Sequence, residues 1–168
     1  MNKVINILTV AIQIGATLIT MFVLFMIFAL LDYRGGIEGL IGILIFQPIM
    51  AIVFSLLTIF ICVIIGLPLR LHRRLNIWWR TKFYISLVLV IIGLTMCIVS
   101  FMPSMIEEIE YNQDGIIQFV TVPNMYLVSI GWFMLAFGIL HSFLPYKLQL
   151  MLSDWLDNRK KNFSSETN

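Results

Sequence analysis

The sequence predicts an all-α integral membrane protein with four transmembrane helices arranged as two hairpins. The first observation is composition, because 60% of the 168 residues are hydrophobic, only 12% are charged, and the mean hydropathy is +0.97. Those values lie far outside the usual balance of a soluble domain. The second observation is a set of four long uncharged runs, and the third is a short segment that occurs twice, after the second run and after the fourth.

Each of the four runs is long enough to cross about 30 Å of hydrocarbon as a helix. We place the spans at residues 4–31, 39–67, 83–102 and 125–144. Strands are disfavoured because the runs show no in-out alternation. The first run is too long for a signal peptide and lacks a small-residue cleavage site, so we expect it to be retained. Residues 1–161 then form one transmembrane domain, followed by a polar tail, 162–168, that we expect to be disordered.

The distribution of Lys and Arg predicts the orientation, because short cytoplasmic loops collect positive charge. Ten of the eleven basic residues fall on the side that holds both termini, and only Arg34 falls on the other. We therefore expect both termini in the cytoplasm. The chain has no recognisable cleavable targeting segment, which favours a bacterial inner membrane over an organelle.

Within the first hairpin, Asp32 to Gly36 predicts a tight outer turn. Pro48 is expected to kink the second span, because proline removes a backbone hydrogen bond. Gln13 and Gln47 fall near the bilayer midplane when they are counted from opposite helix ends. We expect an interhelical polar pair; the alternative is a small polar cavity beside Pro48.

The second outer loop predicts a small extracytoplasmic β-hairpin. Residues 106–111 and 116–122 are rich in β-branched and aromatic residues, and the Asp114-Gly115 pair between them is a hairpin-turn signal. A lone hairpin is marginally stable in water, so it should lean on helix ends, lipid or a partner. The expected partner contacts are its acidic residues, Glu107, Glu108, Glu110 and Asp114.

The repeated segment has the pattern Leu-Pro-x-(Arg/Lys)-Leu-x3-Leu-x2-Trp and occupies residues 67–78 and 144–155. At 100° per residue both copies project as amphipathic helices, which we expect to lie in the cytoplasmic headgroup plane after a proline that turns the chain out of its span. The residues expected to contact anionic phospholipids there are Arg70, Arg73, Arg74, Trp78, Trp79, Arg80, Lys82, Lys147 and Trp155. The alternative is that these charges only enforce the positive-inside rule.

Two explanations of the repeat stay open. Any helix that leaves a membrane toward the cytoplasm tends to collect Pro, basic residues and Trp, so the copies could have converged. Alternatively, residues 1–82 and 83–161 are duplicated units of two spans and one surface helix, related by a pseudo-twofold axis along the membrane normal.

The sequence contains no catalytic, cofactor or metal motif. The spans lack Asp, Glu, Lys and Arg at depth, and such residues usually mark proton relays and coupled ion transport. Cys62 and Cys97 lie toward opposite faces of the membrane, beyond disulfide reach, and His72 and His141 have no further ligands at suitable spacing. We therefore expect no enzyme activity, no cofactor, no metal and no nucleic-acid partner.

The interpretation that remains is a non-catalytic interaction or accessory component of a cytoplasmic membrane. This class includes partner subunits of larger complexes and immunity-type proteins that neutralise a toxin. Small residues at Ala11, Gly15, Gly131 and Gly138 would serve close helix packing, a homo-oligomer or a membrane-protein partner. The alternative function is an oligomeric transporter or channel for small uncharged or lipid-like substrates, built around Gln13, Gln47 and Pro48.

Overall fold

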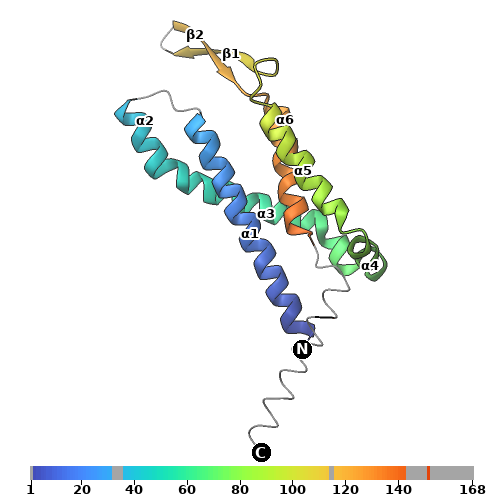
Figure 1. Cartoon of the computed structure of the whole chain (residues 1–168). Helices are drawn as coiled ribbons and strands as arrows, with labels where there is room; N and C mark the ends of the chain where they lie inside the picture. Colours follow the sequence, from blue (N-terminus) through green and yellow to red (C-terminus); the bar gives the residue numbers. More distant parts are fainter. Residues whose placement is uncertain (1, 32–35, 114–115, 143–150, 152–168) are drawn as a thin grey trace, which may run out of the picture.

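The computed structural model describes residues 2–31, 36–113, 116–142 and 151. The elements follow one another, as Figure 1 shows, in the order α1 (Asn2–Leu31), α2 (Ile37–Ile41), the π-helix η1 (Gly42–Phe46), α3 (Gln47–Leu71), α4 (Arg73–Thr81), α5 (Tyr84–Val99), β1 (Glu107–Gln113), β2 (Ile116–Val122) and α6 (Met125–Leu140). The chain is thus mostly helical, with one small two-stranded antiparallel sheet.

Two helices of the described chain are long and apolar enough to cross a membrane, at Ile7–Leu31 and Gly39–Leu71. A third span results if α4 and α5 count together, although the pair bends by 71° at its break. Helix α6 is apolar but has only 16 residues. The predicted membrane-protein class is therefore confirmed at the level of two to three candidate spans.

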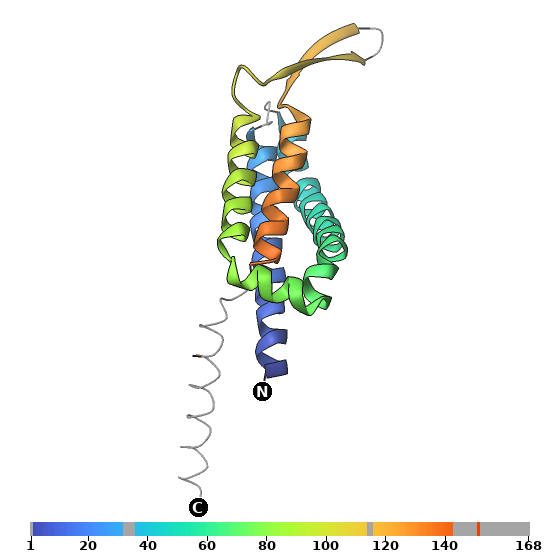
Figure 2. The same cartoon turned by 90° about the vertical axis from the view of Figure 1, so that its right-hand side faces the viewer.

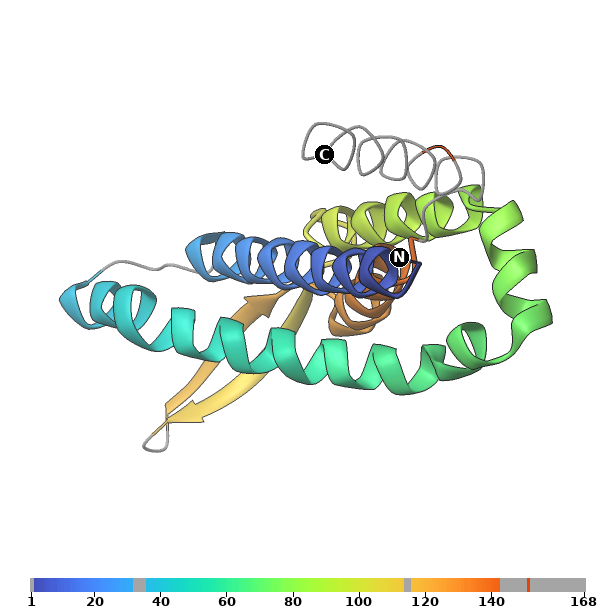
Figure 3. The same cartoon turned by 90° about the horizontal axis from the view of Figure 1, so that it is seen from below.

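The helices form a bundle with two distinct ends (Figure 2). The hairpin of β1 and β2 projects from one end, and α4 runs across the other, where it joins α3 to α5. Viewed from below, α4 turns the chain around the side of the bundle (Figure 3). Helix α5 packs along α6, whereas α1 contacts both α3 and α6. We call these two regions the hairpin end and the α4 end.

Glycine sets the distance between α5 and α6. A Cβ added at Gly93 would lie 2.6 Å from the Leu135 backbone nitrogen and 2.7 Å from the Gly131 carbonyl oxygen. A Cβ at Gly138 would meet the Ser86 carbonyl oxygen at 2.9 Å. Backbone atoms cannot move aside as a side chain can, so this contact requires glycine. By contrast, a Cβ at Gly15 would meet nothing within 4 Å.

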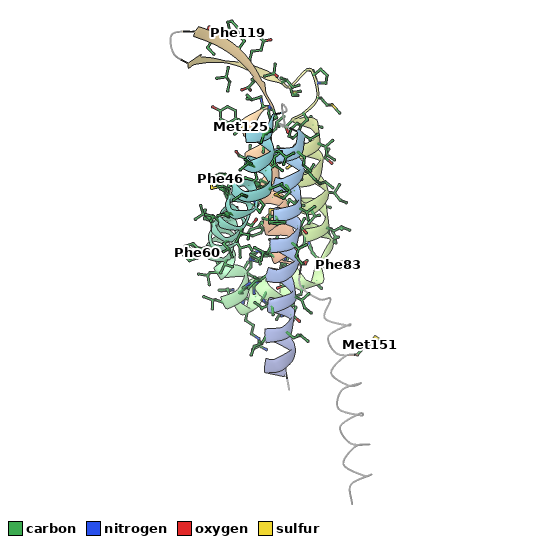
Figure 4. All side chains as sticks on the ribbon, turned by 90° about the vertical axis from the view of Figure 1, so that its left-hand side faces the viewer. Phe46, Phe60, Phe83, Phe119, Met125 and Met151 are labelled. Carbon is green, nitrogen blue, oxygen red and sulfur yellow. The ribbon has the colours of Figure 1, made fainter. Side chains whose placement is uncertain are left out.

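The apolar core gathers where α1, α3 and α6 meet. Its buried members are Met21, Ile59, Cys62, Trp132, Leu135, Ala136 and Leu140. The Trp132 indole donates a hydrogen bond of 2.8 Å to the Thr58 hydroxyl, which leaves no unmet indole donor in the core. Both cysteines are free and buried. Away from this core, Phe46 and Phe60 of the second span point outward from the bundle, and both are exposed (Figure 4).

The hydrogen-bonding register of the second span changes immediately before Pro48. The five residues of η1 adopt π-helical geometry, and α3 begins at Gln47 with proline in its first turn. Proline supplies no backbone N–H and its ring crowds the preceding turn, and a π-type turn is a common way to absorb this. The predicted disturbance at Pro48 therefore takes the form of a π-helix.

Pro68 does not turn the chain out of the second span, as the sequence had suggested. Helix α3 continues to Leu71, and the break falls at His72, whose backbone is extended with φ −84° and ψ 110°. The Asn76 side-chain amide then donates a 3.0 Å hydrogen bond to the Leu69 carbonyl oxygen. That bond ties α4 to an otherwise unpaired carbonyl at the end of α3 and helps to set the direction of α4. The predicted separate surface helix thus exists, as α4, but starts at Arg73.

The predicted hairpin is confirmed. Strands β1 and β2 are antiparallel, with Glu107 paired to Val122 and Gln113 paired to Ile116. The base of the hairpin is fixed to α6 through its N-cap, Asn124. The Asn124 side chain accepts a hydrogen bond from the Leu127 backbone N–H and donates one of 2.6 Å to the Glu107 carboxylate.

Several predictions fall outside the described residues. These are the Asp114-Gly115 turn, the first outer turn except Gly36, and the tail 162–168. The second copy of the repeated segment also falls outside, including Lys147 and Trp155, except for Met151. Gly36 itself adopts a φ of 90°, in the region that favours glycine, as its place in the predicted turn suggested.

Candidate functional site

A cluster of buried polar side chains surrounds the C-terminal end of α6, at the α4 end of the bundle. The last carbonyl groups of a helix have no partner within the helix and must be satisfied from outside. Here three consecutive carbonyls, those of Leu140, His141 and Ser142, accept side-chain hydrogen bonds from four other helices. We call the contributing side chains the polar cluster: Gln13, Arg70, Trp79, Ser86 and His141.

The His141 carbonyl receives two of these donors. The Trp79 indole lies 2.8 Å from it and 3.1 Å from the Ser86 hydroxyl, and that hydroxyl in turn donates to the same carbonyl at 3.0 Å. Both side chains are almost fully buried. Trp79 comes from α4 and Ser86 from α5, so this contact fixes the turn between those helices against the end of α6.

The other two carbonyls accept hydrogen bonds from side chains of α1 and α3. The Gln13 amide donates to the Ser142 carbonyl at 2.8 Å, and the Arg70 guanidinium donates to the Leu140 carbonyl at 3.0 Å. Arg70 also donates to the Gln13 side-chain oxygen at 3.3 Å. A cation at this position interacts favourably with the negative end of the α6 dipole.

His141 occupies the centre of the cluster and is fully buried. Its imidazole stacks on the Phe137 ring at a centroid distance of 4.2 Å, and Nδ1 lies 3.1 Å from the Phe137 carbonyl oxygen. The opposite edge of the ring sits against Gly66 of α3, where an added Cβ would lie 1.7 Å from Nε2. Glycine at this position is what allows α3 to approach.

The predicted lipid-headgroup residues of the first surface helix divide into two groups. Arg70 and Trp79 point into the bundle, which corrects their assignment to the surface. The side chains of Arg73, Arg74, Trp78 and Lys82 are exposed, and Arg80 is half-buried. Lys82 places its ammonium 5.4 Å from the centre of the Trp78 ring, which is a cation–π geometry. The two neighbouring tryptophans, both predicted to contact lipid, differ in exposure, since Trp78 is 46% exposed and Trp79 only 8%.

The structure does not bring Gln13 and Gln47 together. Gln13 belongs to the polar cluster, whereas Gln47 lies at the hairpin end beside Leu31 of α1. Eighteen positions separate residues 13 and 31 on α1, which corresponds to about 27 Å at about 1.5 Å per residue. Counting from the helix ends failed because the start of α1 extends past α4 (Figure 2), so Gln13 lies level with the end of α6 and not at the middle of the bundle.

A pocket of about 540 Å³ lies at the hairpin end. Helix α1 supplies its largest wall, and the start of α3, the end of α5, the base of the hairpin and the start of α6 supply the rest. The lining residues of this hairpin pocket are Phe25, Phe28, Ala29, Leu31, Gln47, Phe101, Ile106, Thr121, Val122, Pro123, Met125 and Val128. This pocket adjoins Gln47, but it is mostly apolar and includes neither Gln13 nor Pro48, so it differs from the polar cavity predicted beside Pro48.

The acidic residues of β1 lie along the exposed hairpin. Glu107, Glu108 and Glu110 all expose their side chains to the surroundings, and Glu107 is also bound by Asn124. Ile109 and Phe119 of the same hairpin are exposed as well. In the described part of the chain, no three His, Cys, Asp or Glu side chains are placed to hold a metal ion.

Sequence reasoning missed Ser86, the role of His141 and the aromatic wall of the hairpin pocket. One available signal was the position of Arg70, which follows an apolar run directly and could reach back toward a neighbouring helix end. The chain matches no protein-family model, no curated protein and no solved structure. The two sites must therefore be interpreted from their own geometry.

Proposed function

We propose that this chain is a four-span membrane protein that acts as a non-catalytic interaction or accessory component of a cytoplasmic membrane. In this proposal α1, α3, α5 and α6 are the spans, and both termini and α4 lie in the cytoplasm. The partner is a larger membrane complex or, for an immunity-type protein, a toxin that acts in the membrane. The concentration of Lys and Arg at the α4 end supports this orientation.

The exposed hairpin is the observation that carries the proposal. It projects away from the helices, as Figures 1 and 2 show, and Phe119 and Ile109 are 64% and 47% exposed. An isolated two-stranded hairpin gains little stability in water, and exposed apolar groups beside acidic ones are typical of a contact surface. Phe119 shares a face with its cross-strand partner Glu110, and Ile109 lies on the other face. A partner that clasps the hairpin on both faces would satisfy both requirements.

The polar cluster supports a non-catalytic role. Its donors from α1, α3, α4 and α5 all end on the backbone of α6, so their hydrogen-bonding capacity contributes to helix packing. Polar side chains that stabilise a membrane bundle in this way need no further purpose.

We further propose that α4 associates with anionic phospholipids. Arg73, Arg74 and Lys82 are exposed on this short helix next to the exposed indole of Trp78. Each basic residue near an anionic surface contributes about 1 kcal/mol of attraction. Replacing Arg73 and Arg74 by Gln should weaken binding to anionic liposomes, while Arg70→Gln should not act through this surface.

The interaction role can be tested by affinity purification in mild detergent from the native membrane. We expect a protein to co-purify in fixed stoichiometry with the wild type and to be lost, roughly tenfold or more, from the Ile109→Ser, Phe119→Ser double variant. Met105→Ser is the matched control, because Met105 is exposed at the same end but lies outside the strands. Equal recovery with the double variant, or recovery of lipid alone, would contradict the proposal.

A second candidate function is transport of lipid-like molecules by an oligomer, and the hairpin pocket is the observation that favours it. Gln47 contributes an amide to an otherwise largely apolar wall. Solute-selective flux into liposomes that is abolished by Gln47→Leu would support this candidate over the first.

A further inference from the structure

The hairpin pocket has the size and the lining of a site for an apolar ligand. A volume of about 540 Å³ lies within the usual range for small-molecule sites. Three phenylalanines, Phe25 and Phe28 from α1 and Phe101 just after α5, contribute aromatic surface to the lining. Phe28 and Phe101 also contact each other, with ring centroids 4.9 Å apart. Such a wall favours a hydrocarbon chain, which fills irregular apolar space without a directional requirement.

One polar side chain in the wall lacks a hydrogen-bond partner. Gln47 is half-buried, and none of the described residues donates to or accepts from its amide. A ligand that carries a carbonyl oxygen beside its hydrocarbon chain would accept a hydrogen bond from the Gln47 amide.

The rim of the pocket is acidic. Val122 and Thr121 line the pocket, and their partners across the strand pair are Glu107 and Glu108, while the lining residue Ile106 directly precedes Glu107. Cross-strand partners share a face and successive residues alternate, so Glu107 lies on the face of Val122 and Glu108 on the face of Thr121. The two carboxylates therefore flank the base of the hairpin on its two faces. Residues 83–142 contain no Lys or Arg, so no basic side chain of α5, the hairpin or α6 offsets their charge. The rim is complementary to a cation.

We propose that the hairpin pocket binds one phospholipid with an amine headgroup, of the phosphatidylethanolamine class. One acyl chain packs against the phenylalanine wall, an ester carbonyl accepts from the Gln47 amide, and the ammonium group lies beside Glu107, with Glu108 attracting it from the other face of the strand. This site goes beyond the interaction role and does not depend on it, because a bound lipid requires no protein partner.

Lipid titration of the purified full-length protein in mild detergent, followed by native mass spectrometry, tests the proposal. The probes are phosphatidylethanolamine and phosphatidylglycerol with identical acyl chains. We expect the wild type to bind the amine lipid roughly three- to tenfold more tightly, as suits one solvent-exposed charge contact and a second carboxylate nearby. The double variant Glu107→Gln, Glu108→Gln should lose this preference. Glutamine at position 107 still offers an oxygen to Asn124, so the hairpin anchor is kept.

Two further variants locate the site. Glu110→Gln removes the same charge from β1, at a position paired with Phe119 instead of a wall residue, and should keep the preference. Ala29→Trp fills the pocket and should reduce the binding of both lipids, with melting temperature as the check on folding. The proposal is overturned by equal binding of the two lipids to the wild type. Preference retained without Glu107 and Glu108, or binding unchanged by a folded Ala29→Trp protein, overturns it as well.

Discussion

The imidazole of His141 lies directly against the backbone of Gly66, so closely that no other residue fits at position 66 without displacing the ring. A Cβ at Gly66 would lie 1.7 Å from Nε2 and 2.3 Å from Cε1. The ring cannot retreat easily, because Phe137 stacks on one face and its Nδ1 is held at the Phe137 carbonyl oxygen. This contact between a glycine and a histidine determines how closely α3 can approach α6 at the α4 end.

Gly66→Ala should therefore destabilise the protein by about 1–3 kcal/mol, as expected when a packed site is overfilled. Gly15→Ala is the matched control, since a methyl group there meets nothing within 4 Å and alanine is the better helix former. Unfolding in detergent, followed by circular dichroism, measures both. Equal stability of the two variants would show that α3 and α6 are not in the contact described.

Trp79→Phe should lower the free energy of unfolding by about 1–2 kcal/mol, because the indole donor to the His141 carbonyl is lost while the ring is largely preserved. Trp78→Phe, one position earlier and exposed, should change it by less than about 0.5 kcal/mol. The same unfolding measurement distinguishes them. A larger effect at Trp78 would show that Trp78, and not Trp79, is the tryptophan packed inside the bundle.

Arg70→Gln should destabilise the protein by about 1.5–3 kcal/mol, because the charged donor to Leu140 and Gln13 is removed from the negative end of the α6 dipole. Arg74→Gln, on the exposed surface of α4, should leave the unfolding free energy nearly unchanged. A larger effect of Arg74→Gln than of Arg70→Gln would instead support the predicted contact of Arg70 with lipid headgroups.

Asn124 allows the helix cap to be separated from the hairpin anchor. Asn124→Ala removes both and should cost about 1 kcal/mol. Asn124→Asp keeps an acceptor for the Leu127 N–H but loses the donor to Glu107 and adds a like charge beside it. We expect amide hydrogen exchange to accelerate in β1 and β2 in both variants, and at the start of α6 only in the alanine variant. Unchanged exchange in the strands would exclude the Glu107 contact as an anchor.

The sequence predicted the local elements well because they depend on local patterns. β-Branched and aromatic residues around an Asp-Gly pair located the hairpin, and the spacing of Leu and Trp located α4. Pro48 marked a real change in helical register. These features depend on neighbours along the chain, and sequence displays those directly.

The candidate sites were less predictable, because they depend on which helix end meets which. Arg70 and Trp79 resemble surface anchors in sequence and become interior donors only because the end of α6 lies within their reach. Gln13 and Gln47 resemble a pair only if the start of α1 is level with the other helix ends, and α1 instead extends past them. Ser86 gave no signal, since serine is common in apolar helices that pack closely.

The hydrogen-bonded carbonyls at the end of α6 affect how this short helix fits the thickness of a bilayer. Sixteen residues extend about 24 Å at about 1.5 Å per residue, less than the roughly 30 Å of a typical hydrocarbon layer. A short helix usually thins the surrounding membrane so that its ends can reach water. In the proposed four-span arrangement α6 has no such need at one end, because side chains of the neighbouring helices solvate it in place of water. In that arrangement we expect the bundle to tolerate bilayers of different thickness.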